Sequence, residues 1–137
     1  MKIKPFWLLS MAALSASISS QSFAIETSES FTEGKKLYEK NCLACHQANG
    51  QGMRGAFPPL AGSDYLMADK QRAISIPLKG LQGKITVNGD NYNSAMPAFT
   101  NLKDNEIAHI MTYVMNAWGN QGELVTADEV TQIRNGN

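Results

Sequence analysis

The sequence predicts a small all-α domain of three to five helices, with one short β-hairpin near residues 84–93. Apolar residues recur at helical spacing over 103–118, and a second amphipathic stretch covers 32–44. An Asn-Gly pair between two short runs favours a hairpin. Glycine and proline concentrate in residues 47–63, where we expect an ordered loop. A chain of 137 residues has room for one such domain.

The first predicted element is a helix over 32–44. Residues 25–32 are polar and acidic and predict a loose lead-in. Thr32 is a suitable N-cap, with Glu33 in the first turn. The helix brings Cys42 to its C-terminal end. On its inner side we expect Phe31, Leu37 and Tyr38.

The middle and end of the chain predict three more elements besides the loop. A short helix runs from residue 63 or 64 to 77, and residues 84–87 pair with 91–92 across the turn that contains Asn88-Gly89. The clearest helix covers 103–118 and ends at Gly119. Lys103 cannot accept a cap hydrogen bond, so Asp104 is the expected cap. Residues 126–134 predict one further short helix.

The N-terminus has the pattern of a cleaved export signal. A basic start precedes an apolar run over 6–16, and Ser22-Phe23-Ala24 ends the segment as a small-x-small cleavage site. A retained membrane anchor is the alternative, but the run has about half of the ~20 residues that a spanning helix needs. We therefore expect removal of residues 1–24, a mature domain over 25–137, and a periplasmic location.

The charge pattern excludes several kinds of partner. The formal net charge is zero, and loss of the two lysines of the signal leaves a slight acidic excess without blocks of like charge. Such a surface offers no basic footprint for nucleic acid or anionic lipid. We expect neither nucleic-acid binding nor membrane insertion after signal cleavage. A mature chain this short also has a thin core and commonly needs a disulfide, metal or cofactor.

Cys42-Leu43-Ala44-Cys45-His46 has the C-x-x-C-H spacing by which haem is covalently attached. Each thiol can add to one vinyl group, and His46 then lies beneath the iron as an axial ligand. A disulfide, half of a zinc site and a thioredoxin-like pair are the alternatives. Zinc would lack a fourth ligand, because His109 is the only other histidine, and the βαβ pattern of a redox pair is absent. We predict one haem c bound through Cys42 and Cys45.

Met96 is the predicted second axial ligand. A thioether opposite His46 favours ferrous iron and raises the reduction potential. Met96 lies fifty residues beyond His46 outside any predicted helix, and Pro97 restricts it to an extended conformation. The other methionines beyond the signal are too close to the motif or lie in predicted helices, where they fill a core: Met53, Met67, Met111 and Met115.

Three further residues have predicted positions. The carbonyl of Pro58 is expected to accept a hydrogen bond from the second ring nitrogen of His46. Alternatively, the Pro58-Pro59 pair only stiffens the loop. His109 falls outside the apolar stripe of its helix, so we expect it to be exposed to solvent and not to bind metal. Trp118 is a predicted core residue.

With these motifs the sequence resembles class I c-type cytochromes. The resemblance rests on Gly34-Lys35-Lys36-Leu37-Tyr38, Pro58-x-Leu60, Met96-Pro97 and a final helix with Tyr113. It implies the cytochrome c fold, with three to five helices around one covalent haem and with Gly34 packed against Tyr113 where the terminal helices cross. The segment 57–98 is similar to monohaem domains that accompany periplasmic oxidoreductases, including copper-type nitrite reductases and some membrane dehydrogenases or oxidases.

The expected function is periplasmic electron transfer of one electron on a His/Met-ligated haem, without enzymatic activity. Expected partners are transient redox proteins such as a respiratory oxidoreductase. Contact is predicted where the haem edge reaches the surface, around Gln47, Met53, Gly55, Ala56, Ala95 and Pro97. Two alternatives stay open: a haem enzyme or gas sensor with a displaceable sixth ligand, and a fixed electron-entry subunit of a larger complex.

Overall fold

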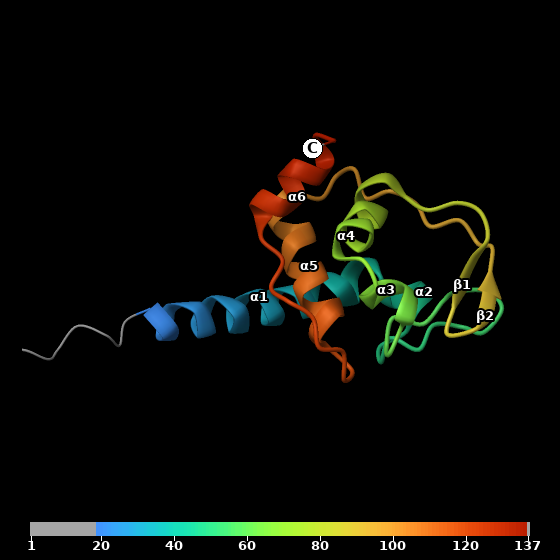
Figure 1. Ribbon diagram of the computed structural model, residues 1–137, viewed down its shortest axis with the longest axis horizontal. Helices are drawn as coiled ribbons and strands as arrows, with labels where there is room; N and C mark the ends of the chain where they lie inside the picture. The colour runs from blue at the N-terminus through green and yellow to red at the C-terminus, as the bar shows by residue number, and fades with distance from the viewer. Residues whose placement is uncertain (1–18, 137) are drawn as a thin grey trace, which may run out of the picture.

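The structure is a computed structural model that describes residues 19–136, with side chains from residue 27 onward. It is helical apart from one two-stranded hairpin, as predicted, and the hairpin lies at the end of the molecule away from the start of the first helix (Figure 1). The elements in this part of the chain are α1 Ser19–Asn41, α2 Leu43–His46, α3 Asp64–Met67, α4 Lys70–Lys79, β1 Ile85–Val87, β2 Asp90–Tyr92, α5 Asp104–Asn116 and α6 Ala127–Arg134.

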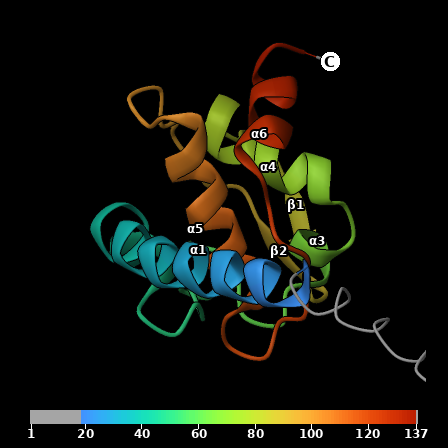
Figure 2. The same cartoon turned by 90° about the vertical axis from the view of Figure 1, so that its left-hand side faces the viewer.

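The crossing of α1 and α5 is the centre of the fold (Figure 2). Gly34 of α1 lies directly against the backbone of α5. A Cβ atom at Gly34 would be 1.9 Å from the carbonyl oxygen of His109 and 2.8 Å from the Cβ of Tyr113. Only a residue without a side chain permits this approach. The contact between Gly34 and Tyr113 that the family resemblance implies is confirmed.

Four aromatic rings pack around this crossing. Tyr113 lies 5.0 Å from Phe31, 5.4 Å from Tyr38 and 5.3 Å from Trp118, measured between ring centroids. Tyr38 is fully buried, and its hydroxyl donates to the carbonyl of Gln47 at 2.6 Å. Trp118 is half-buried and packs against this core. The cluster therefore joins both helices to the start of the loop that follows α2.

Replacing Gly34 with alanine is expected to lower the free energy of unfolding by about 1–3 kcal/mol, because the added methyl group overlaps a backbone carbonyl that cannot move alone. Thermal unfolding followed by circular dichroism measures the loss. Lys35→Ala is the control, since Lys35 is exposed on the same helix and its pair with Glu39 is loose. Equal stability of the two variants would contradict the close contact.

The lead-in predicted over 25–32 is helical, because α1 begins at Ser19. Thr32 is consequently inside the helix and caps nothing; its hydroxyl donates to the carbonyl of Ser28, one turn earlier, at 2.9 Å. No glycine or proline interrupts residues 19–33. Burial of Ser30 and Phe31 against the rest of the fold further favours a helical backbone here.

His109 is not on a solvent-facing surface, contrary to expectation. It is half-buried between α5 and α1, and its Nδ1 lies 3.0 Å from the hydroxyl of Ser30. The prediction assumed that only the apolar stripe of α5 is covered by other parts of the fold. Because Gly34 lets α1 approach α5 closely, α1 also covers His109, which lies beside that stripe.

The helix predicted over 63–77 is two helices. Ser63 caps α3 by accepting from the backbone N–H of Leu66 at 3.1 Å, and the carboxylate of Asp69 caps α4 by accepting from the N–H of Arg72 at 3.0 Å. The extended backbone of Asp69 separates them. Pro77 does not end the second helix, which continues to Lys79. The prediction ended the helix at Pro77 because proline usually stops a helix. In the last turn, however, proline removes only one backbone hydrogen bond, so the helix continues past it.

The predicted hairpin is confirmed. β1 and β2 pair antiparallel, with Ile85 opposite Tyr92 and Val87 opposite Asp90 across the turn Asn88-Gly89. Reciprocal hydrogen bonds hold this turn to α3. The N–H of Asn88 donates to the carboxylate of Asp64 at 2.7 Å, and the N–H of Asp64 donates to the Asn88 side chain at 3.0 Å.

The last two helices are held together by Asp104, which does not cap α5 as expected. Its carboxylate accepts from the hydroxyl of Thr131 and from Nε of Arg134, both at 2.6 Å. The N–H of Lys103 instead donates to the Glu106 carboxylate at 2.9 Å. The short helix predicted over 126–134 is confirmed as α6.

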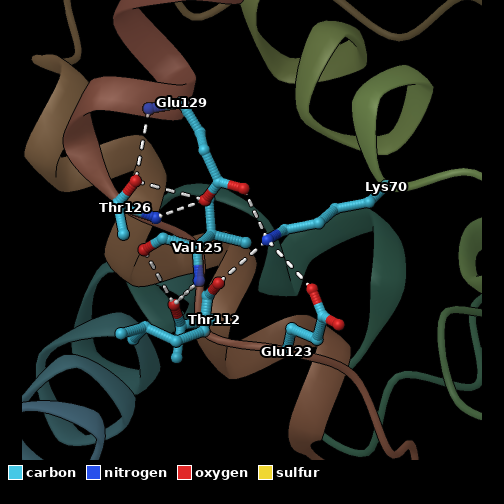
Figure 3. A network of polar contacts seen from close by, with 7 residues as sticks. Lys70, Thr112, Glu123, Val125, Thr126 and Glu129 are labelled. Atoms are coloured by element: carbon cyan, nitrogen blue, oxygen red, sulfur yellow. Dashed lines mark hydrogen bonds and ion pairs between the residues drawn. The ribbon is translucent and has the colours of Figure 1, made fainter. Parts of the chain in front are cut away.

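Lys70 joins the start of α4 to α6 and to the preceding loop (Figure 3). Its ammonium donates to Glu129 at 2.6 Å and to the carbonyl of Leu124 at 3.0 Å, and it lies 3.5 Å from Glu123. Burial alone would raise the pKa of Glu129, but the hydrogen bonds from Lys70 and Thr126 outweigh it, so the pKa is lowered.

Glu129→Gln is therefore expected to lower stability at neutral pH by about 1 kcal/mol. A carboxyl group with a lowered folded-state pKa stabilises the fold above its unfolded pKa, and this contribution disappears as the pH falls through the folded value. The difference between variant and wild type should accordingly shrink at acid pH in urea titrations. Glu123→Gln is the matched control, because Glu123 approaches the same lysine but is 84% exposed. An equal loss in both variants, or a loss independent of pH, would contradict this account.

The first 18 residues of the predicted export signal lie outside the described residues. Within residues 19–136, no helix combines the length and the apolar character that crossing a bilayer requires.

Candidate haem site

The C-x-x-C-H motif forms a single helical turn directly after α1. The N–H of His46 donates to the carbonyl of Cys42 at 3.0 Å, and positions four apart on a turn share one face. Cys42 and His46 therefore point to the same side, whereas Cys45 is exposed. The two thiols are not joined in a disulfide. Burial, followed by the effect of Cys45, raises the pKa of the Cys42 thiol to about 12.

His46 is oriented by the loop that follows it. Its side chain is buried, and its Nδ1 lies 3.0 Å from the carbonyl oxygen of Pro58, as predicted. A carbonyl only accepts, so Nδ1 carries the hydrogen and Nε2 retains a lone pair. Burial lowers the pKa of His46 more than the Pro58 hydrogen bond raises it. The imidazole is thus neutral, which is the form that binds metal ions.

Gly52 makes the approach of Pro58 possible. Its φ is 62°, and a Cβ atom there would lie 2.3 Å from the carbonyl oxygen of Phe57 and 2.6 Å from that of Pro58. The N–H of Gly52 donates to the carbonyl of His46 at 3.0 Å. The loop therefore folds back on the motif. Gly52 permits this fold because a side chain at this position would collide with the two carbonyl groups.

An apolar cavity, partly open to solvent, adjoins the motif. Cys42, His46 and Met96 all line it, although Met96 is far from the other two in sequence. The remaining wall is almost entirely apolar. It comes from the loop, the helices α3, α4 and α5, and the hairpin: Pro58, Pro59, Leu60, Ser63, Tyr65, Leu66, Ala73, Ile76, Pro77, Leu81, Ile85, Val87, Phe99, Ile110, Met111 and Val114.

Backbone hydrogen bonds fix Met96 at this cavity. Met96 and Leu81 exchange both N–H···O bonds, at 2.9 and 3.0 Å. The N–H of Phe99 donates to the carbonyl of Pro77 at 2.8 Å. The segment that carries Met96 is thus tied to the end of α4 on both sides, in agreement with the rigid extended loop predicted from Pro97.

Met111 also lines the cavity, which sequence reasoning missed. The sequence analysis predicted that Met111 fills the core, and it is indeed buried, with 4% of its surface exposed. The apolar stripe of α5 faces both the core and the cavity, so periodicity could not separate the two roles. Met53 is exposed and Met67 packs against the core, and neither lines the cavity.

Asn120 is a second residue that the sequence did not single out. Its side-chain amide donates to the carbonyls of Leu60 and Val114, and its oxygen accepts from the N–H of Gly62 at 2.9 Å. It therefore holds the wall of the cavity to the end of α5. An asparagine next to a helix-stopping glycine has no signal that distinguishes it from an ordinary turn residue.

The zinc alternative finds no support in residues 19–136, where no group of three His, Cys, Asp or Glu side chains is placed to hold a metal ion. His109, the one other histidine, lies against Ser30 instead.

Comparison with known sequences identifies the family. The sequence pattern of the family described as Cytochrome c matches residues 31–118, which contain the motif, the loop, the hairpin and α5. The chain belongs to the cytochrome c family. It is a class I monohaem c-type cytochrome, and its cofactor is haem c.

Two kinds of relative are similar to this cytochrome. Cytochrome c-552 of Thermus thermophilus is 42% identical over 111 residues, which cover 74% of this chain and 84% of the relative. The cytochrome subunit of fructose dehydrogenase from Gluconobacter japonicus is 35% identical over 113 residues, or 77% of this chain and 22% of the subunit. The cytochrome c subunit of quinone alcohol dehydrogenase from Gluconobacter oxydans is 30% identical over 105 residues, again 22% of that subunit. The family and these relatives make electron transfer the class of function.

The residues at the cavity fit haem c. A neutral histidine with a fixed tautomer provides a nitrogen ligand, an adjoining thiol lies at the cavity wall, and apolar side chains match a macrocycle.

Proposed function

We propose that this cytochrome is an exported one-electron carrier whose haem is held by Cys42 and Cys45 and whose iron is ligated by His46 and Met96. The observation that carries the proposal is the convergence of Cys42, His46 and Met96 on one apolar cavity. These residues come from two segments fifty residues apart, and the hydrogen bonds of the Met96 segment to the end of α4 support the proposal.

Each residue has a chemical task in this proposal. Haem, when bound, supplies reversible one-electron chemistry at its iron. The two thiols each form a thioether bond by adding across a vinyl group, which prevents loss of the cofactor. His46 provides Nε2 because Pro58 holds Nδ1–H, and the soft thioether of Met96 favours ferrous iron. If His46 and Met96 both hold the iron, a substrate would have to displace one of them to reach it, so we propose a carrier and not an enzyme.

Partner contact is proposed around Met53, which is the one exposed large hydrophobic side chain among the described residues, at 52%. The proposed contact surface comprises Gln47, Met53, Gly55, Ala56, Ala95 and Pro97, most of which are exposed. Electron-transfer encounters bury small areas and are short-lived. The likeness to dehydrogenase cytochrome subunits supports an oxidoreductase as partner. Gel filtration of native extract distinguishes a diffusing carrier from a fixed subunit.

Export to the periplasm and removal of residues 1–24 belong to the same proposal and rest on the pattern of the N-terminus. Cleavage after Ala24 leaves a chain over 25–137 and shortens α1 to Ile25–Asn41, which still contains Gly34 and the aromatic contacts with α5. The intact mass of the periplasmic protein tests the cleavage site.

Visible spectra of the purified mature protein test the electron-carrier assignment. We expect low-spin spectra in both oxidation states, a sulfur-to-iron charge-transfer band in the oxidised protein, and no response of the reduced protein to carbon monoxide. A high-spin spectrum or ready carbon monoxide binding would indicate an open iron site and favour the enzyme or sensor alternative.

A further inference from the structure

The turn that follows α5, over residues 117–120, contains a residue in a strained backbone conformation. Trp118 has a φ of 55°, in the left-handed region that a bulky residue rarely adopts. The N–H of Asn120 donates to the carbonyl of Ala117 at 2.9 Å and closes the turn. Such a conformation persists only where the surrounding structure holds it, and it occurs preferentially at functional sites. The contacts of Trp118 and Asn120 therefore indicate the role of this turn.

Trp118 packs against the first half of the loop that follows the motif. Its Nε1 donates to the carbonyl of Ala48 at 3.2 Å, and a Cβ atom at Gly50 would lie 2.6 Å from its ring. The carbonyl of Gly50 in turn accepts from the N–H groups of Leu60 and Ala61, at 2.7 and 2.9 Å. Trp118 thus contacts the residue to which the second half of the loop is hydrogen-bonded.

Asn120 holds the second half of the loop directly. Its side-chain nitrogen donates to the carbonyls of Leu60 and Val114, at 3.0 and 2.9 Å, and its oxygen accepts from the N–H of Gly62 at 2.9 Å. The residue is 8% exposed, and its two partners in the loop lie 60 and 58 positions earlier in the chain. A buried amide that is fully hydrogen-bonded to distant segments fixes their relative positions. Asn120 therefore ties the loop to the end of α5.

Pro58 depends on this tie because its own segment has few anchors. Neither proline of the pair 58–59 has an N–H, so neither donates a backbone hydrogen bond. Phe57 and Met53 exchange hydrogen bonds at 2.8 Å, but both lie in the loop and move with it. Asn120 begins to hold the chain two residues after Pro58. The position of the Pro58 carbonyl is thus fixed from α5, on the opposite side of the loop from the motif.

We propose that Asn120 keeps the carbonyl of Pro58 on Nδ1–H of His46 and is thus a positioning residue for the haem ligand. The proposal rests on the ligation of iron by His46 proposed above. An imidazole whose Nδ1–H has a fixed acceptor is a more basic ligand through Nε2. A more basic ligand favours ferric iron, so Asn120 opposes the effect of the Met96 thioether on the reduction potential.

NMR of the reduced holoprotein with nitrogen-15-labelled histidine tests this role, because it observes Nδ1–H of His46 directly. We expect Asn120→Ala to accelerate the exchange of this proton with solvent about tenfold more than the exchange of the buried Ile110 amide in α5. The reduction potential should rise as the hydrogen bond to Pro58 weakens. Asn116→Ala is the matched control, since the Asn116 amide donates to a carbonyl within α5 itself. This variant should change neither the exchange ratio nor the potential.

The alternative is that Asn120 only stabilises the fold as a whole. Asn120→Ala would then accelerate the exchange of both protons equally and leave the potential unchanged, and that result overturns the proposal. The wild type gives a second test that needs no variant to fold. At low denaturant, Nδ1–H of His46 should lose protection together with the N–H of Gly62, which donates to Asn120. Exchange at Gly62 while the His46 proton stays protected also overturns the proposal.

The visible spectrum of the wild type separates this proposal from the function on which it rests. A protein without covalent haem, or without the sulfur-to-iron band, overturns the proposed function. An intact spectrum, together with a His46 proton that is insensitive to Asn120→Ala, overturns only the role of Asn120.

Discussion

Replacing Met96 with alanine is expected to abolish the sulfur-to-iron charge-transfer band and to lower the reduction potential by on the order of 0.2 V, within the roughly 0.8 V that axial ligands span. The thioether favours ferrous iron, so its loss stabilises the ferric form. The open position should also bind carbon monoxide in the reduced protein. Absorption spectroscopy and a redox titration measure all three effects.

Met111→Leu is the matched control for this experiment. Met111 lines the same cavity but belongs to α5, and leucine preserves its volume and apolar character. We expect this variant to retain the charge-transfer band and nearly the wild-type potential. If Met111→Leu loses the band and Met96→Ala keeps it, the axial ligand comes from α5 and the assignment of Met96 is wrong.

Replacing both Cys42 and Cys45 with alanine is expected to remove covalent haem completely and with it the cooperative unfolding transition. Without haem, the apolar side chains that line the cavity lose the cofactor surface against which they pack, and apolar burial is the main contribution to the roughly 5–15 kcal/mol by which a small domain is stable. Haem staining of a denaturing gel measures attachment, and circular dichroism on heating measures the fold.

The single variants Cys42→Ala and Cys45→Ala are the controls, because each leaves one thiol for one thioether bond. Both should still stain for haem. Cys42 lies at the cavity wall and Cys45 is exposed, so loss of Cys42 should destabilise the protein more. Staining that persists in the double variant would mean that other residues hold the cofactor covalently and would refute the attachment.

The sequence predicted the parts of this protein whose signals are short-range. Five consecutive residues contain the attachment motif, and the turn Asn88-Gly89 specifies its hairpin without help from the rest of the chain. Pro58 was predicted to face His46 because a metal-binding histidine needs an acceptor for its second nitrogen, and a nearby carbonyl could supply it. The role of Met96 as ligand remains a prediction, although its place at the cavity agrees with it.

Errors arose where a local signal competed with a contact between distant segments. Thr32 looked like a helix start, but packing of Ser30 and Phe31 extends α1 past it. Asp104 looked like a cap, yet Arg134 and Thr131, about thirty residues later, take its carboxylate. A side chain has only a few hydrogen-bonding positions, and the sequence does not tell which candidate partner lies near enough to use them.

The sequence by itself determined the fold class, the attachment motif and the candidate ligands, because periodicity, spacing and turn chemistry act over a few residues. Tertiary structure decided what surrounds them. It placed His109 against Ser30 and brought Met111 to the wall of the cavity that Met96 also lines. These outcomes depend on how α1, α4 and α5 pack around one cavity. Packing brings together residues that are far apart in the sequence, and their separation along the chain does not reveal how close they lie in space.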